Sequence, residues 1–257
     1  MDYTEDIQGL ALFRGSKYVQ CETGETFRQA EHFLKQGRVV LYTGTPCQIA
    51  ALKKFLPKSY DNLLTVDFIC HGVPSPKVWE YYLKSFKSIT YINFRNKSEG
   101  WKKFHIVIKD RDKLISEPFY DNAYMRAFLS DMILRPSCYS CPTRRGKSGS
   151  DITIGDHWAI STTQPEFDDD KGTSLILINT EKGKSFWNNQ QVMFIETALE
   201  SSKQHNGGFL DTIEIHPHRE RFFKKLDRTK NISQLILREL KTPLYERVIL
   251  KFKTLLK

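Results

Sequence analysis

The sequence has few cysteines, no long apolar run and no low-complexity segment. Its five cysteines are an odd number and are sparse for 257 residues, which argues against a disulfide scaffold and favours a reducing cytoplasm as the setting. No stretch of about 18 apolar residues is present, so no membrane span is expected. Residues 1–6 are acidic and lack an apolar segment, so no signal peptide is predicted.

What is present is a globular composition, with 40% hydrophobic and 27% charged residues. The net charge of +9 is unevenly distributed, because residues 217–257 carry 12 Lys and Arg against 4 Asp and Glu. The nearly neutral body argues against a nucleic-acid partner. We therefore expect a main domain over 1–215 and a basic helical tail over 216–257. The last helix is expected to be a solvated helix that closes the domain, and a peripheral contact with a membrane surface or a partner is the alternative.

Apolar residues in the first third of the chain alternate between helical spacing and short continuous runs. Gly37 ends the first helical pattern, and Pro46 and Pro76 suit the first positions of the next two helices. Helices that separate buried strands in this way are typical of a parallel sheet. The predicted helices are 26–36, 46–55 and a third from 76, and the predicted strands are 39–43 and 63–70.

Later segments predict a different arrangement. Residues 89–95 and 104–109 alternate apolar and polar side chains, as half-buried antiparallel strands do. The expected fold class is α/β, a mixed sheet with parallel βα units in the N-terminal half, antiparallel strands in the middle and a helical C-terminal tail. Further predicted strands lie within 10–19, 151–158, 175–178 and 192–195, and further helices are 122–134, 181–189, 219–226, 232–240 and 244–256.

Four of the five cysteines stand in loops beside proline or glycine. Cys47 lies in Gly-Thr-Pro-Cys-Gln, and Cys70 opens Cys-His-Gly-Val-Pro. Cys138 and Cys141 form a Cys-x-x-Cys pair that is followed by proline. Four thiols in such settings predict a metal or cluster site shared by distant segments. Cys21 lacks this context and is treated as the spare.

Cys47 is expected in the first turn of a helix that follows a strand. Thr45 suits the N-cap of that helix and Pro46 its first position. The partial positive charge at a helix N-terminus lowers a thiol pKa and stabilises an anionic ligand. The alternative is a small cysteine that only packs in the turn. Cys70 is also expected at the carboxyl end of a strand, where open α/β sheets place their sites.

The spacing of the cysteines bears on which metal they bind. Structural zinc usually takes two close pairs of ligands, but only Cys138 and Cys141 form such a pair. Iron–sulfur clusters accept scattered thiolates, and Cys141-Pro142 is similar to the Cys-Pro that closes many cluster motifs. The sequence therefore favours an iron–sulfur cluster, with zinc as the alternative.

Two polar groups near these cysteines are further candidates. Arg144, Arg145 and Lys147 either form a solvated loop, compensate the charge of an anionic cluster, or bind a nucleotide phosphate. Asp156 and His157 follow a predicted strand and are candidates for acid–base work or for orienting a ligand. A single histidine is more often structural, so that alternative stays open.

Four motifs follow one another along the chain: Gly44-Thr-Pro-Cys47-Gln, Val66-Asp-Phe-Ile-Cys70-His-Gly-Val-Pro-Ser-Pro76, Arg135-Pro-Ser-Cys138-Tyr-Ser-Cys141-Pro and Asp151-Ile-Thr-Ile-Gly-Asp-His-Trp158. Together they resemble the coenzyme F420 hydrogenase/dehydrogenase beta-subunit family, over about residues 14–223. The resemblance implies an oxidoreductase in which one 4Fe–4S cluster exchanges electrons with FAD, and FAD exchanges hydride with the deazaflavin F420 or another acceptor. It also implies that the four cysteines of these motifs are the cluster ligands.

The resemblance extends to further residues and to partners. Flavin or substrate contacts are expected near 43–48 and 155–158, at Thr43, Gly44, Thr45, Pro46, Gln48 and Gly155, with Arg144 and Lys147 as further cofactor-binding candidates. Family members usually begin with a Ser-Gly-Gly-containing segment, and many carry a ferredoxin domain. This chain resembles a member that is shortened at its N-terminus. A redox partner protein or ferredoxin domain is therefore expected from another chain. The alternatives are a structural zinc module and an inactive fragment.

Overall fold

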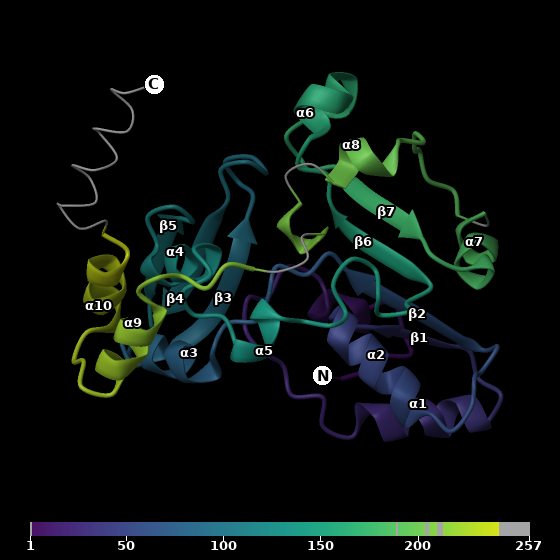
Figure 1. The fold of residues 1–257 in the computed structure, drawn as a ribbon, viewed down its shortest axis with the longest axis horizontal. Helices are drawn as coiled ribbons and strands as arrows, with labels where there is room; N and C mark the ends of the chain where they lie inside the picture. Colours follow the sequence, from purple (N-terminus) through teal and green to yellow (C-terminus); the bar gives the residue numbers. More distant parts are fainter. Residues whose placement is uncertain (1, 189, 204–205, 210–212, 242–257) are drawn as a thin grey trace.

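The computed structural model describes residues 2–188, 190–203, 206–209 and 213–241, which form two sheets that lie side by side (Figure 1). In the first sheet, the first three strands in spatial order are parallel and the fourth is antiparallel to its neighbour. The second sheet has three antiparallel strands. The first sheet has the order β1 (Val40–Thr43), β2 (Leu63–Phe68), β6 (Ile152–Asp156), β7 (Ser174–Ile178), and the second β3 (Ile89–Asn96), β4 (His105–Asp110), β5 (Lys113–Pro118).

Helices α1 (Thr26–Lys35) and α2 (Pro46–Phe55) pack against one face of the first sheet. Their apolar side chains form a small core with Tyr42 of β1 and Leu63 of β2. Gly37 ends α1 with a φ of 78°, a left-handed conformation that suits glycine. The predicted helix–strand alternation and the parallel pairing of β1 with β2 are confirmed.

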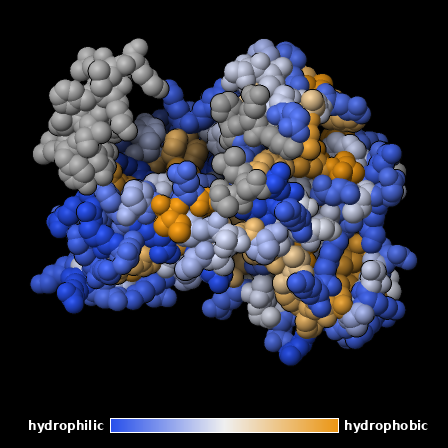
Figure 2. Space-filling model, viewed as in Figure 1, coloured by the Kyte–Doolittle hydropathy of each residue, from blue (hydrophilic) through white to orange (hydrophobic). Residues whose placement is uncertain are grey.

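The opposite face of the first sheet is partly open. Leu41, Phe68 and Ile154 share this face by their strand registers, and all three are exposed. Figure 2 shows apolar residues reaching the surface over β6 and β7. Sheets with parallel strands are usually covered on both faces, so this face is unusual for its type.

Helices α3 (Pro76–Leu83), α4 (Ala123–Leu129), α9 (Arg219–Leu226) and α10 (Ile232–Glu239) surround the second sheet. Tyr124, Phe222 and Ile236 are fully buried in one apolar core with strand residues such as Ile106. The residues expected in a basic tail thus include two helices that pack into this core. The division into domains at residue 215 stays a prediction, and the predicted helix 244–256 lies outside the described residues.

The mixed α/β fold class is confirmed, but some elements differ from expectation. The predicted strands within 10–19 and over 192–195 are wrong. In the first case Tyr18 packs against Phe94, and the Tyr18 carbonyl accepts a hydrogen bond from the Tyr124 hydroxyl at 2.7 Å. This carbonyl therefore bonds to a side chain and not to a neighbouring strand. In the second, the apolar residues Met193 and Phe194 are exposed and unpaired with any described strand.

Shorter helices complete the chain. The helix predicted over 122–134 ends at Leu129, and Asn122 is its N-cap. No described helix is long and apolar enough to cross a membrane. The remaining helical segments are η1 (Gly9–Leu12), α5 (Pro136–Tyr139), α6 (Ile160–Thr163), η2 (Pro165–Phe167), α7 (Glu181–Trp187), α8 (Leu199–Lys203) and η3 (Gly207–Phe209).

Candidate functional site

Cys47, Cys70, Cys138 and Cys141 line one cavity, which we call the cysteine cavity. They come from the start of α2, the end of β2, and α5 with the loop that follows it. Figure 1 shows α5 between the two sheets. The cavity is also lined by Pro46, Asp67, Phe68, Ile69, Gly72, Val73, Thr143, Arg144, Arg145, Gly146, Thr153, Gly208 and Phe209.

Local capping positions Cys47. Thr45 is the N-cap of α2, Pro46 is its first residue, and the Thr45 backbone N–H donates to Gln48 Oε1 at 2.9 Å. This arrangement fixes Cys47 in the first turn, with its Sγ 3.1 Å from the Thr45 hydroxyl oxygen. The predicted cap-plus-proline start of this helix is confirmed. Gln48 Nε2 also donates to the sulfur of Cys21 at 3.1 Å, so the fifth cysteine lies near this turn.

Cys70 lies where β2 ends. The Ile69 backbone N–H donates to the Ile154 carbonyl at 2.8 Å, which holds the strand to β6 up to that point. Gly208 closes over this segment, since a Cβ there would lie 2.3 Å from Ile69 Cγ2 and 3.2 Å from the Cys70 nitrogen. Burial, and then the nearby thiol of Cys138, raises the pKa of Cys70 to about 12.

The Cys-x-x-Cys pair is held from two sides. The Val73 backbone N–H donates to Cys138 Sγ at 3.3 Å, and the Thr143 hydroxyl oxygen lies 3.1 Å from Cys141 Sγ. Burial raises the pKa of the Cys138 thiol, and the Val73 N–H opposes that shift. Each of the four sulfurs thus has one N–H or hydroxyl partner, and Gly72 supplies the one for Cys70.

Arg144 brings a buried positive charge to the cavity wall. Its guanidinium donates to the carbonyls of His71, at 3.5 Å, and Gly207. Arg145 also lines the cavity, whereas Lys147 is exposed and does not. Of the three basic residues in this loop, two are therefore placed to balance negative charge in the cavity.

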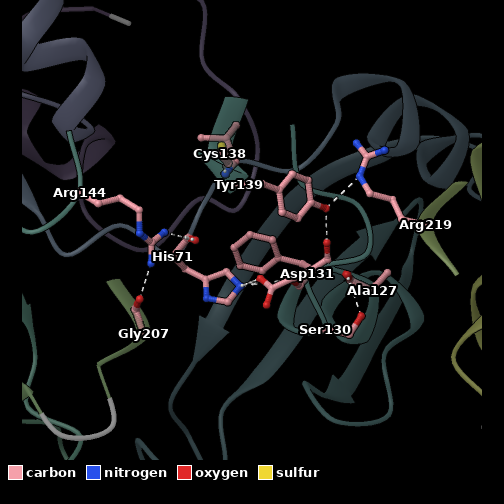
Figure 3. A network of polar contacts seen from close by, with 11 residues as sticks. His71, Ala127, Ser130, Asp131, Cys138, Tyr139, Arg144, Gly207 and Arg219 are labelled. Carbon is pink, nitrogen blue, oxygen red and sulfur yellow. Dashed lines mark hydrogen bonds and ion pairs between the residues drawn. The ribbon is translucent and has the colours of Figure 1, made fainter. Parts of the chain in front are cut away.

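A polar network connects the cysteine segments to the C-terminal helices (Figure 3). His71 Nε2 lies 3.0 Å from Asp131 Oδ1, and the Tyr139 hydroxyl donates to the Asp131 carbonyl. Arg219 Nε donates to the Tyr139 hydroxyl oxygen at 2.9 Å. Sequence reasoning missed this network. The Cys-His-Gly motif pointed near His71, but no local signal marks Asp131 or Arg219.

Asp67 is a second site residue that sequence reasoning missed. It is buried in the cavity wall and accepts hydrogen bonds from Ser150 Oγ at 2.8 Å and Thr153 Oγ1 at 2.5 Å. A carboxylate within a predicted buried strand was the available signal, because a buried charge needs partners and therefore marks a structured polar site.

Several predicted contact residues lie beside the cavity without lining it. Thr43 ends β1, Gly44 follows it in the turn and Gln48 is in the first turn of α2, and a Cβ on Gly44 would lie 3.0 Å from Gln48 Oε1. Gly155 faces Ile69, where a Cβ would lie 2.5 Å from Cδ1. The glycines are thus explained by packing within the protein, and their flavin contacts stay predictions.

Asp156 and His157 also lie outside the cavity lining. Asp156 Oδ2 is paired with Arg95 Nη1 at 2.6 Å. His157 is buried, and burial lowers its pKa, so the neutral imidazole is favoured. The structure does not bring these two side chains to the cysteines.

The four thiols line the cavity from three segments of the chain. Among the described residues, no group of three or more His, Cys, Asp or Glu side chains is close enough together to hold a single metal ion. All five cysteines are free thiols. The arrangement therefore offers four separate soft ligands around one space.

Comparison with known proteins gives one family. The model of the C-terminal part of the coenzyme F420 hydrogenase/dehydrogenase beta subunit matches residues 37–202, more than half of the chain. The matched region contains all four cavity cysteines. No curated protein matches the chain.

Proposed function

The chain belongs to the coenzyme F420 hydrogenase/dehydrogenase beta-subunit family, and from this membership we propose that it is an iron–sulfur oxidoreductase module. In this proposal Cys47, Cys70, Cys138 and Cys141 hold a 4Fe–4S cluster. When bound, the cluster supplies one-electron transfer, and FAD links it to hydride exchange with F420 or another acceptor. The observation that carries the proposal is that these four cysteines line one cavity although up to 94 residues separate them.

The donor set suits a cluster. Four thiols are the ligands of a 4Fe–4S cluster, and hydrogen bonds to the sulfurs are among the features that set its potential. The N–H groups of Gly72 and Val73 supply such contacts to Cys70 and Cys138, and the Thr143 hydroxyl lies within reach of Cys141 Sγ, whereas the Thr45 hydroxyl donates to Gln48 Oε1. The buried guanidinium of Arg144 offsets the negative charge of thiolates in this space.

We propose a cluster in preference to zinc because of how the cysteines are spaced along the chain. Structural zinc usually takes two close pairs of ligands, and only Cys138 and Cys141 form such a pair. Iron–sulfur clusters accept thiolates from separate segments, as Cys47 and Cys70 would supply here.

A flavin next to the cluster is supported by Phe68. Its side chain lines the cysteine cavity and is 40% exposed on the open face of the first sheet, so a flat ring can pack there beside the cluster. We propose that FAD lies near the turn 43–48 and the end of β6, where Gly155, Asp156 and His157 are candidate contacts. If Asp156→Asn and His157→Ala leave flavin content unchanged, this placement is wrong.

Membership in a beta-subunit family implies other subunits as partners. We propose that a redox partner protein or a ferredoxin domain on another chain exchanges electrons with this one. A reducing compartment such as the cytoplasm would keep the five thiols free for cluster assembly.

The first experiment is anaerobic purification with iron, sulfide, zinc and flavin quantified per chain. Cys138→Ser is compared with Cys21→Ser, which removes the cysteine outside the cavity. We expect near-stoichiometric iron and sulfide in the wild type and in Cys21→Ser, and their loss in Cys138→Ser. Bound zinc alone, or no metal and no flavin after reconstitution, would overturn the electron-transfer proposal.

A further inference from the structure

A second concave surface lies on the other side of α5 from the first sheet. This α5–α9 groove has a volume of about 480 Å³. It lies where the segment leading into α9 passes α5, and Figure 2 shows an apolar patch at the surface there. The groove is lined by Pro136, Tyr139, Ile215, Arg219, Glu220, Phe223 and Lys224.

The groove has an apolar floor that is open to solvent. Ile215 is 63% exposed, and the Arg219 guanidinium carbon lies 5.3 Å from the Tyr139 ring centre and 4.4 Å from the Phe223 ring centre. Arg219 also donates to the Leu134 carbonyl at 2.8 Å, so its side chain is held by both rings and by the backbone. Such a surface accepts an apolar side chain from a partner with little reordering.

The charged residues of the groove, which we call its basic rim, are Arg219, Lys224 and Glu220, an excess of one positive charge. The exposed residues Arg135 and Glu214, next to lining residues in the sequence, carry opposite charges. Lys224 is paired with Glu220 at 2.5 Å, but both side chains are largely exposed, so solvent and partner carboxylates compete easily for this lysine. A second copy of the chain would bring the same basic rim and a net charge of +9, which disfavours self-association and favours an acidic partner.

The groove lies next to the proposed cluster ligands. Tyr139 directly follows Cys138 in α5, and the two side chains lie close together in Figure 3. Cys138 lines the cysteine cavity, whereas Tyr139 lines the groove. A protein seated in the groove is therefore separated from the cavity by only the thickness of α5.

We propose that the α5–α9 groove docks a small acidic electron-carrier protein, which inserts an apolar side chain flanked by carboxylates. This proposal rests on the proposed function. One electron passes from the reduced carrier to the oxidised cluster, or from the reduced cluster to the oxidised carrier. One partner is oxidised as the other is reduced, and no proton is transferred and no bond is formed or broken. Burying the carrier's carboxylates near the basic rim sets the orientation of the complex and speeds its encounter.

The test uses the cluster-loaded full chain and an acidic plant-type ferredoxin as the probe. Lys224→Glu and Ile215→Glu are made in the groove. The matched controls are Lys35→Glu, which removes an i,i+4 pair with the partly buried Glu31 on α1, and Ile7→Glu, at an exposed apolar residue outside the groove. Binding is measured by calorimetry, and cluster reduction by stopped flow with reduced ferredoxin and separately with dithionite.

We expect the groove variants to lower the rate with ferredoxin by about tenfold or more at low salt, an effect that salt weakens, while dithionite reduction stays unchanged. The control variants should behave like the wild type. Equal losses in Lys224→Glu and Lys35→Glu would overturn the proposal. So would binding to anionic phosphatidylserine vesicles without binding to ferredoxin, or a wild-type dimer that Ile215→Glu dissociates.

Iron and sulfide content separates this proposal from the proposed function. A chain that binds no cluster but still binds ferredoxin through Lys224 and Ile215 would refute the cluster and leave the docking groove standing. A chain that holds its cluster and shows the same ferredoxin binding in groove and control variants would refute the groove alone.

Discussion

The first sheet keeps polar groups in its interior, whereas the second packs against an almost wholly apolar core. In the first sheet Thr65, Asp67 and Thr153 are buried and bonded to one another or to neighbouring loops. In the second, most buried side chains are aromatic or aliphatic, with Tyr124 and Phe222 among the largest, and Asn122 and Glu239 are polar exceptions.

The difference indicates a division of labour between the two halves. Polar interiors provide less stability per residue, but they fix side chains in one arrangement when every group has a partner. The polar side chains of the cysteine cavity come from the first sheet and the connections around it, and none comes from the strands of the second sheet. We infer that the apolar core stabilises the chain while the polar sheet shapes the cavity.

The largest expected effect is a loss of stability in the apolar core of the second sheet. Phe222→Ala should lower the free energy of unfolding by about 3–5 kcal/mol, because it leaves a cavity in the apolar core. Urea denaturation measures this loss, and iron content at 25 °C should stay at the wild-type level. The matched control is Phe13→Ala, at an exposed ring, which should change stability little. If the folded Phe222→Ala variant lost iron, the inferred separation between a stabilising apolar core and a cavity-shaping polar sheet would be wrong.

A smaller loss of stability is expected in the polar half. Thr153→Val removes the hydroxyl that donates to Asp67 and accepts from Asn179 Nδ2 at 2.9 Å, leaving buried polar atoms without a partner. The free energy of unfolding should fall by about 1–3 kcal/mol. Iron content should fall as well, since Thr153 lines the cavity. Thr43→Val, at an exposed position, is the control.

The pH dependence of stability sharpens the comparison within the first sheet. Burial raises the pKa of Asp151, but hydrogen bonds from Thr65 and Thr180 outweigh burial and leave that pKa below its usual value. A carboxyl with a lowered folded pKa stabilises above its unfolded pKa of about 3.9 and loses that contribution as pH falls through the folded value.

Asp151→Asn should therefore be less stable than the wild type by about 1–3 kcal/mol at pH 7, with the gap closing below about pH 4. Urea midpoints between pH 7 and pH 3 measure this gap. Asp112→Asn, in an exposed turn, is the control. A gap that stays constant with pH would show that Asp151 acts through packing and not through charge.

The smallest expected effect concerns salt. Glu239 of α10 is buried and paired with Arg221 at 2.5 Å and Lys225 at 2.9 Å, both half exposed. Raising the salt concentration to 1 M should reduce the loss caused by Glu239→Gln by less than about 1 kcal/mol, because the cations are screened. The loss caused by Asp151→Asn should change less, since its hydrogen-bond partners are neutral hydroxyl and amide groups and the charge of Lys53 is the smallest influence on its pKa.

Sequence patterns predicted the elements whose cause is local. The start of α2 depends on Thr45, Pro46 and Gln48, which are neighbours in the chain, and the structure has the helix there. By contrast β5 was missed, because Lys113–Pro118 shows no alternation of apolar and polar residues and is a strand through its pairing with β4. An apolar run such as 192–195 fails for the opposite reason, since it finds no described neighbour to pair with.

The candidate site divides in the same way. Composition and spacing singled out the four cysteines and the basic loop after them, and all four cysteines line one cavity. Local spacing could not pair His71 with Asp131, or Arg219 with Tyr139, because 60 and 80 residues separate these partners. Contacts of this kind are set by how the two sheets pack, which is a property of the whole fold.

The cavity draws its thiols from three separate stretches of chain, between Cys47 and Cys141. Under the proposed ligation, a bound cluster is also a covalent cross-link that closes loops of 23, 68 and 3 residues along the chain. Closing such loops restricts the unfolded ensemble, and the entropy involved grows only slowly with loop length. Loss of the cluster would therefore remove a cross-link between distant parts of the chain as well as a redox centre. We expect the resistance of the chain to proteolysis to fall as a result.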